Sequence, residues 1–403
     1  MIEMGYSWKK DPYKSIVPPR KDGVYLSIAY GLKDVATAAK IFAGEEKGYA
    51  YARCGEGNPT VRAFERAMAE TEAGVLGGYD AIATSSGMAA IMLLCLELAT
   101  DGKNEIVSSS FIYGGTYSLF TQFLPKLGIT CKMVQNPNDI DSWDEAISPK
   151  TAFAFIESAS NPLVDIPDIE KVAERVQSHG VPLVCDNTVL TPVLHHPLDY
   201  GVDVVVHSVS KAINGHSTGL GGVIVADEKL IREIRSSWAI VLGAVMDPDC
   251  AKRMHKGLKS LPERIFRHSE NALNLAKFLC ERNEIANVHY PMLPSSPSYP
   301  IAEAYGLEGG GPLLAFELKG ELKDAVKFIE SLKVVIHATH LGHNKTIATH
   351  PASTTHSKVP KETREKLGIS DTLIRISAGS ESKKEFRKVL EDIKIALKSA
   401  NLK

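Results

Sequence analysis

Short apolar runs alternate with segments of helical periodicity through the middle of the chain, from about residue 56 to 245. The pattern predicts helices over 87–98 and 171–179. It predicts strands over 80–84, 105–108, 151–156, 181–185, 203–207 and 222–226. Because these runs are apolar without polar alternation, the strands should be buried on both faces, as in a mostly parallel sheet that helices cover on both sides.

The pattern changes after about residue 247. A long helix is expected over 262–282, with a polar face that carries Arg264, Arg267, Glu270 and Asn271. The segments 313–318 and 373–377 alternate as half-buried strands do. We therefore expect three parts: an irregular arm over 1–55, an α/β domain over 56–246, and a smaller α+β domain over 247–403.

Composition agrees with two domains and excludes several classes of protein. The 403 residues exceed the roughly 250–300 that one hydrophobic core usually serves. With 46 basic and 48 acidic residues the net charge is −2, so neither nucleic acid nor an anionic membrane is an expected partner.

The longest apolar stretch, 88–96, is far shorter than the roughly 18 residues that cross a bilayer. The first twenty residues lack an apolar core of the kind found in signal peptides, and the six cysteines are scattered, so we expect a cytoplasmic protein.

Three features carry candidate chemistry. Lys211 follows the apolar run 203–207, and a buried amine with a lowered pKa is suited to Schiff-base formation. Asp186 ends another apolar run, where a carboxylate could face a ligand at the edge of the sheet. The stretch Ser86-Gly87-Met88 lies between a strand and a helix, where free backbone amides suit a phosphate. Each has an ordinary alternative: a solvated lysine, an aspartate in a turn, and a helix cap.

Taken together and in this order, the three features resemble the pyridoxal phosphate (PLP)-dependent enzymes of cysteine and methionine metabolism, the trans-sulfuration enzymes. The resemblance runs from about Lys40 to Glu381. Its further landmarks are Tyr51-Ala-Arg53, Asn58-Pro-Thr60, Tyr113-Gly-Gly-Thr116, Glu157, Asn161-Pro162, Asp186-Asn-Thr188, His207-Ser-Val-Ser-Lys211, Arg267-His-Ser-Glu-Asn271, His350-Pro-Ala-Ser-Thr-Thr-His356 and Arg375-Ile-Ser-Ala-Gly379. The resemblance implies the fold of the aspartate aminotransferase class (fold type I), PLP as the cofactor, and no metal.

The resemblance also implies roles for the matching residues. Lys211 would hold PLP as a Schiff base, Asp186 would keep the ring nitrogen protonated, and Tyr113 would stack on the ring and assist proton transfer. Arg375 would bind the carboxylate of an amino-acid substrate. Asn161 would lie near both the PLP hydroxyl and that carboxylate, and His340 would line the substrate site. The phosphate would be bound by Ser86, Gly87, Met88, Ser208 and Ser210, and, from a neighbouring subunit, by Tyr51 and Arg53. A homo-oligomer with shared active sites, a dimer of dimers, is therefore expected.

Within the family, the segment 113–128 is most similar to O-acetylhomoserine sulfhydrylases. Gly115 stands where methionine γ-lyases typically have cysteine, and Thr218 is common in sulfhydrylases. Thr339 stands where enzymes that handle cystathionine usually have glutamate. These residues favour replacement of a γ-substituent by sulfide or a thiol. Methionine γ-lyase, cystathionine γ-synthase or γ-lyase, and a PLP-binding protein without turnover stay as alternatives.

Two departures from the family pattern bear on the site. Cys-Gly-Glu-Gly separates Arg53 from Asn58, two residues more than the family spacing, so we expect the arm to loop differently there. His340 stands where relatives have serine or asparagine, which changes the surroundings of Arg375. The spacing of His337, His340 and His343 resembles a metal motif only weakly, because no carboxylate or cysteine pattern supports it.

Overall fold

The computed structural model describes residues 7–400 except 101 and 358. Its centre is a seven-stranded sheet with the order β3-β9-β8-β7-β6-β4-β5, in which β9 alone runs antiparallel to its neighbours. Its strands are β3 (Tyr79–Thr84), β4 (Glu105–Ser109), β5 (Thr130–Val134), β6 (Thr151–Glu157), β7 (Leu183–Asp186), β8 (Val204–His207) and β9 (Gly222–Asp227). The predicted mostly parallel sheet is confirmed.

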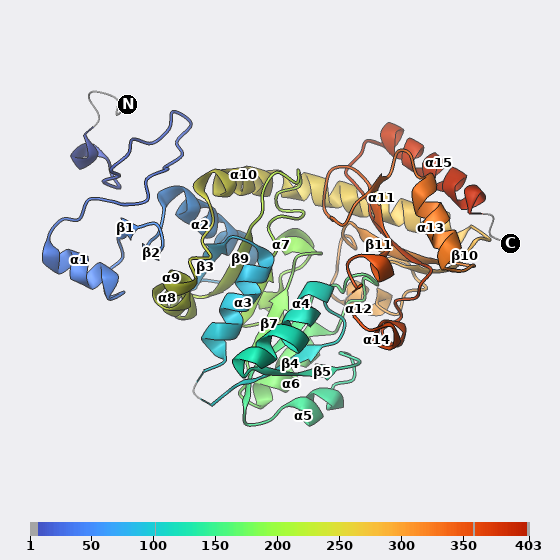
Figure 1. Cartoon of the computed structure of the whole chain (residues 1–403), viewed down its shortest axis with the longest axis horizontal. Coiled ribbons are helices and arrows are strands. Elements are labelled where there is room, and N and C mark those ends of the chain that lie inside the picture. Colours follow the sequence, from blue (N-terminus) through green and yellow to red (C-terminus); the bar gives the residue numbers. More distant parts are fainter. Residues whose placement is uncertain (1–6, 101, 358, 401–403) are drawn as a thin grey trace.

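Helices cover both faces of this sheet (Figure 1). Successive residues of one strand enter opposite cores: Val205 packs in one cluster, whereas Val204 and Val206 pack in the other. Both faces therefore demand apolar side chains, which explains why the strands show no polar alternation. The helices of this region are α2 (Pro59–Ala73), α3 (Gly87–Leu98), α4 (Gly114–Ser118), α5 (Asp141–Ala146), α6 (Ile169–Ser178), α7 (Thr191–Leu194), α8 (Glu228–Ser236), α9 (Trp238–Leu242) and α10 (Pro248–Lys259).

A second, mixed sheet has the order β10-β11-β14-β13-β12, with its own core against α11, α13 and α15. Its elements are α11 (Leu261–Cys280), β10 (Ile285–His289), α12 (Tyr299–Ala304), β11 (Leu313–Leu318), α13 (Leu322–Ser331), β12 (Ile336–His337), β13 (Ile347–Thr349), α14 (Lys361–Lys366), β14 (Leu373–Ser377) and α15 (Lys383–Ser399). The expectation that β11 and β14 are half-buried is wrong, because both strands lie in the middle of this sheet and are buried almost throughout. In β14, Ile374 and Ile376 enter the core, and Arg375 between them faces the large sheet's domain.

Helix α11 joins the two regions (Figure 1). Leu261 and Ile265 at its start pack in a core of the large sheet, and Leu275 and Leu279 near its end pack in the core of the small one. The prediction that Asn271 lies on a polar face of this helix, exposed to solvent, is therefore wrong. Asn271 is 1% exposed and donates hydrogen bonds to the carbonyls of Gly379 and Glu381. A helix between two domains is covered on both sides, so its polar groups bond to carbonyls rather than to water.

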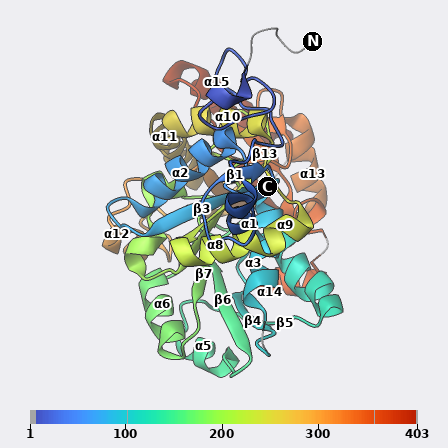
Figure 2. The ribbon, with the colours of Figure 1, turned by 90° about the vertical axis from the view of Figure 1, so that its left-hand side faces the viewer.

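Residues 7–55 project from the side of the molecule that carries α8 and α9 (Figures 1 and 2). We expected an irregular arm here, and this is wrong in part, because these residues contain the helix α1 (Val35–Phe42). The side chain of Asp34 caps this helix. They also contain a hairpin of β1 (Tyr49–Tyr51) and β2 (Cys54–Gly55). Asn58 then caps α2 by accepting from the amides of Thr60 and Val61. Among the described residues, no helix combines the length and apolar character that crossing a bilayer requires.

Candidate active site

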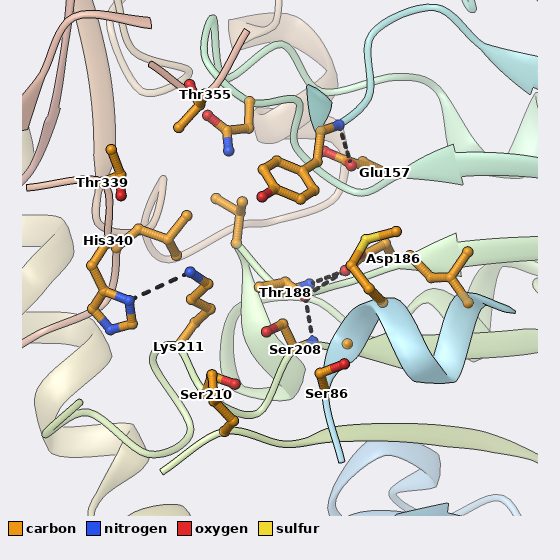
Figure 3. Close-up of a pocket in the computed structure, with 18 of the residues that line it drawn as sticks. Ser86, Glu157, Asp186, Thr188, Ser208, Ser210, Lys211, Thr339, His340 and Thr355 are labelled. Carbon is orange, nitrogen blue, oxygen red and sulfur yellow. Dashed lines mark hydrogen bonds between the residues drawn. The ribbon is translucent and has the colours of Figure 1, made fainter. Parts of the chain in front are cut away.

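A cavity of about 400 Å³ lies between the carboxyl ends of the parallel strands and the small sheet. Open α/β sheets bind ligands at this edge, because the strands end there and the following loops diverge. Eleven of the predicted site residues line the cavity: Ser86, Gly87, Met88, Tyr113, Asn161, Asp186, Ser208, Ser210, Lys211, His340 and Arg375. They come from seven separate segments of the chain, and Figure 3 shows most of them around one space.

One end of the cavity is formed by the start of α3 and the loop after β8. Ser86 caps α3 by accepting from the amide of Ala89, which leaves the amides of Gly87 and Met88 without an acceptor inside the helix. A Cβ atom at Gly87 would lie 2.8 Å from the Cβ of Ser208, so only glycine lets the two segments approach this closely. Ser210 lines the same end, but its hydroxyl is already bonded to the backbone of Gly221.

Asp186, at the end of β7, is held in a fixed orientation. Its Oδ1 accepts from the backbone amide of Thr188 at 3.0 Å and from the Thr188 hydroxyl at 2.5 Å. The Thr188 Oγ1 in turn accepts from the amide of Ser208 at 2.7 Å, which ties the strand end to the next loop (Figure 3). Burial raises the pKa of Asp186 above its usual value, and the bonds from Thr188 oppose that rise.

Glu157 is a site residue to which the sequence analysis assigned no role. It ends β6 beside Asp186, and its Oε1 accepts from the backbone amide of Tyr113 at 2.6 Å. Burial and the neighbouring Asp186 raise its pKa well above the usual range. The signal that could have found it is the one that found Asp186, a carboxylate at the end of a wholly apolar run. Thr188, Thr339 and Thr355 also line the cavity and were given no site role from the sequence.

Lys211 extends into the middle of the cavity. Burial, with a smaller contribution from the charge of Arg375, lowers the pKa of its amine to about 8. About a tenth of the amine is therefore neutral near pH 7, far more than for a free lysine, and the neutral form is the nucleophile. The Nζ atom lies 3.4 Å from Nδ1 of His340 (Figure 3).

Arg375 is buried opposite Lys211 with 2% of its surface exposed. Its Nη1 donates to Oδ1 of Asn161 at 3.1 Å and its Nη2 to the carbonyl of His340 at 3.0 Å. Within the described part of the chain no carboxylate pairs with it, and its Nε has no hydrogen-bond partner. A buried guanidinium without an acid is costly unless a ligand supplies the anion.

The structure does not bring Tyr51 and Arg53 to the cavity of their own chain. Arg53 lies in the turn of the β1–β2 hairpin, and in the longer spacer before Asn58 the residues Cys54 and Gly55 form β2. The guanidinium lies over the Tyr51 ring, 5.6 Å from its centre, and Nη1 donates to the carbonyl of Ile240 at 2.6 Å. The two side chains therefore lie against each other across a turn.

Comparison with known proteins decides the family. The family model for Cys/Met metabolism PLP-dependent enzymes matches residues 6–398.

The chain belongs to this family.

Similar members carry out different reactions. The O-succinylhomoserine sulfhydrylase of Pseudomonas aeruginosa is 37% identical over 362 residues, covering 89% of this chain and 87% of the relative. The L-methionine gamma-lyase of Pseudomonas putida is 35% identical over 400 residues, covering 99% and 96%. A crystal structure of a protein from Campylobacter jejuni designated an O-acetylhomoserine (thiol)-lyase superimposes with a TM-score of 0.88 at 33% identity, covering 96% of this chain and 97% of the other, and contains a pyridoxyl lysine phosphate. The chain is thus a PLP-dependent trans-sulfuration enzyme, and the resemblance found from the sequence is confirmed.

The residues present fit PLP, the cofactor of this family. The free amides at the start of α3, beside the closely packed Ser208 loop, are donors of the kind that bind a phosphate. Asp186 lines the same cavity as a fixed acceptor, and Lys211 extends its amine into it. Within the described residues, no group of three or more His, Cys, Asp or Glu side chains is arranged to hold a metal ion.

Proposed function

We propose that the enzyme replaces the γ-substituent of an O-acylhomoserine, with O-acetylhomoserine as the preferred substrate, with sulfide to give homocysteine. The observation that carries the proposal is the buried, acid-free Arg375 facing Lys211, because it makes the cavity a site for the α-carboxylate of an amino acid. In such a reaction the acyl group leaves Cγ as a carboxylate with its bonding electrons, and sulfide forms the new bond to Cγ.

Three positions support γ-replacement over the other family reactions. Thr339 lines the cavity, where a glutamate would place a negative charge near the substrate. Gly115 lies directly beneath Tyr113: a Cβ atom there would lie 2.4 Å from Cε1 of the tyrosine ring, so a cysteine would displace the ring. Thr218 gives weaker support, since its hydroxyl and amide bond to the side chain of Asn214.

Bound PLP supplies an electron sink that stabilises negative charge on substrate carbon. In the proposed mechanism Lys211 anchors the cofactor and, when released by the substrate, accepts a proton from carbon. Tyr113 would stack on the cofactor ring and assist proton transfer, and Asp186 would keep the ring nitrogen protonated. Arg375 and Asn161 would hold the substrate carboxylate with a bidentate geometry that a lysine could not reproduce. The phosphate would be held by Ser86, Gly87, Met88, Ser208 and Ser210.

The second candidate reaction is γ-elimination, as in methionine γ-lyase, or the related chemistry of cystathionine. It uses the same residues, and a methionine γ-lyase is among the similar relatives. A PLP-binding protein without turnover is a poorer explanation, because Lys211, Tyr113 and Arg375 would then have no reason to converge on one cavity.

Product analysis should separate these reactions. With O-acetylhomoserine and sulfide, the purified enzyme should form homocysteine with a kcat/KM at least about tenfold higher than for cleavage of methionine or cystathionine, a ratio that needs about 1.4 kcal/mol of transition-state discrimination. As the control for γ-elimination, the release of 2-oxobutanoate is measured with each substrate in the absence of sulfide. A higher kcat/KM for methionine would overturn the proposed reaction and leave the cofactor assignment intact.

We further propose that two subunits share each active site, with Tyr51 and Arg53 serving the phosphate of the neighbour. The arm projects from the chain, and several large apolar side chains on it are exposed, among them Val35 and Phe42. A phosphate dianion in a dry crevice needs compensating charge, and a guanidinium is an efficient donor.

Co-expression of two inactive variants tests this sharing. Arg53→Ala should weaken PLP retention and Lys211→Ala should remove the covalent link, so each variant alone is inactive. A mixed dimer places both lesions in one site and leaves the other intact, so the two chains together should recover about a quarter of wild-type activity if they pair at random. Absence of recovery in isolated mixed dimers would mean that Arg53 serves its own subunit or no site at all.

A further inference from the structure

A buried pair of a carboxylate and an imidazole lies next to the residues that line the cavity. Oε2 of Glu72, in the last turn of α2, is 2.6 Å from Nε2 of His207, the last residue of β8. Both side chains are fully buried, and neither lines the cavity itself. His207 was noted from the sequence only as a family landmark, and Glu72 was given no role.

The stability of the fold does not explain this pair. Taking a carboxylate and an imidazole out of water is costly, and apolar side chains of similar size at such places are often neutral for stability or stabilising. The second nitrogen of the imidazole, Nδ1 of His207, is buried without a hydrogen-bond partner among the described residues. The pair therefore has to be explained by what it holds in place.

One connection from the pair to Asp186 runs through Asn187, the next residue in the chain. Oε1 of Glu72 accepts a hydrogen bond from Nδ2 of Asn187 at 3.4 Å. The same Nδ2 also donates to the carbonyl of His195 at 2.8 Å, and Oδ1 of Asn187 accepts from the hydroxyl of Ser158 at 2.7 Å. Asn187 is fully buried, so these bonds fix the chain directly after β7.

The other connection runs through Ser208, which directly follows His207. The amide of Ser208 donates to Oγ1 of Thr188 at 2.7 Å, and the Thr188 hydroxyl donates to Oδ1 of Asp186 at 2.5 Å. One carboxylate on α2 thus holds the ends of both β7 and β8, and the Asp186 side chain is bonded between these two strand ends.

Only a carboxylate at position 72 can hold both strand ends at once. Nδ2 of Asn187 is a donor whose orientation is set by its other bonds. Because Nδ1 of His207 has no acceptor, the hydrogen of the neutral ring belongs on Nε2, which is then a donor as well. A glutamine has the same size but one acceptor oxygen, so Glu72→Gln must lose one of the two bonds.

We propose that Glu72 and His207 position Asp186, by holding the ends of β7 and β8 at the spacing that aims its carboxylate at the ring nitrogen of the cofactor. The inference rests on the proposed role of Asp186. A hydrogen bond between a carboxylate and a protonated ring nitrogen is short and depends strongly on direction. Loss of the pair should therefore weaken the contact with the ring nitrogen more than any other contact of the cofactor.

A cofactor analogue without the ring nitrogen provides the test. 1-Deaza-PLP has carbon at that position and keeps the aldehyde and the phosphate, so it offers Asp186 no N–H donor. The full-length, cofactor-free chain is titrated with each compound, and the ratio of the two dissociation constants is the readout. We expect wild type to bind PLP about 100-fold more tightly than the analogue.

Glu72→Gln should lower this ratio about tenfold, through weaker binding of PLP, while binding of 1-deaza-PLP stays within about threefold of wild type. Glu317→Gln is the matched control, because Oε1 of Glu317 lies 3.3 Å from Nε2 of His289 in the small sheet and neither residue lines the cavity. Its ratio should equal that of wild type.

A double variant tests the pair with the packing largely kept. Glu72→Met combined with His207→Leu removes both polar side chains together, so no buried charge is left without a partner. The variant should unfold near the wild-type temperature and should lose the same factor of about ten in the ratio, because the two residues act as one unit. A wild-type ratio in this variant would overturn the proposal.

The remaining outcomes separate the role of the pair from that of Asp186. If Glu72→Gln bound both compounds less tightly by the same factor, the pair would support the fold alone. Unchanged binding of both compounds would also overturn its role. If wild type bound the two compounds equally tightly, the proposed role of Asp186 would fail together with the inference. The proposed γ-replacement is tested separately, by its products.

A second measurement reads the ring nitrogen directly. In holoenzyme prepared with PLP that carries nitrogen-15 in the ring, solid-state NMR reports the protonation of this nitrogen through its chemical shift. Wild type and Glu317→Gln should show the protonated form, whereas Glu72→Gln should show a larger share of the neutral form at the same pH, because a displaced carboxylate stabilises the proton less. Identical signals in Glu72→Gln and wild type would contradict the positioning role.

Discussion

Replacing Lys211 by alanine should abolish covalent retention of PLP and lower turnover at least about 1000-fold. The amine lies in the middle of the cavity, and burial lowers its pKa to about 8, which makes it the nucleophile of the site. Borohydride reduction of the wild-type holoenzyme followed by peptide mapping should place the pyridoxyl group on Lys211. The variant should lose its visible absorption band on dialysis.

Lys229→Ala is the matched control for this experiment. The side chain of Lys229 is 82% exposed on α8, so its removal should change neither the absorption spectrum nor the turnover. If the pyridoxyl group mapped to another lysine, the assignment of the whole cavity would be wrong, since every other role in the proposed mechanism is defined relative to Lys211.

Replacing Arg375 by lysine should lower kcat/KM roughly 10- to 100-fold, mainly through a higher KM. Lysine keeps the charge but loses the fork of parallel donors that matches a carboxylate. It also has one donor nitrogen in place of the two with which Arg375 reaches Asn161 and the carbonyl of His340. Steady-state kinetics with O-acetylhomoserine and sulfide would measure the effect.

A substrate amide provides the internal control for Arg375. Because the amide lacks the carboxylate, wild type and Arg375→Lys should use it about equally poorly. Arg267→Lys, at a partly exposed arginine that pairs with Glu270, should leave both substrates unaffected. If the variant lost as much activity with the amide as with the acid, Arg375 would be supporting the fold rather than binding the carboxylate.

Local pattern was sufficient to predict the elements of the large sheet. Strands buried on both faces need uninterrupted apolar runs, and β6, β8 and β9 follow the predicted segments almost residue for residue. The same logic identified Asp186 and Lys211, because a polar group directly after a buried strand is costly unless it has a partner or a ligand. The landmarks of the family supplied the remaining site residues.

The second domain shows where local pattern was insufficient. An alternating strand has the same sequence signature whether its polar face meets water or another domain. Arg375 in β14 could therefore be assigned to solvent or to the cavity, and only the family resemblance favoured the cavity. Asn271 on α11 was misplaced for the same reason, because periodicity cannot show that a helix is covered on both sides.

The sequence by itself determined the architecture of the large domain, the family and the residues that surround the cavity, since each depends on local periodicity or on short motifs. Only the tertiary structure decided how distant segments meet. It placed Glu157 beside Asp186 on neighbouring strands, and His340 within 3.4 Å of Lys211, 129 residues away in the chain. The physical reason is that proton affinity and charge pairing depend on distance and burial, and both arise only when the two domains pack together.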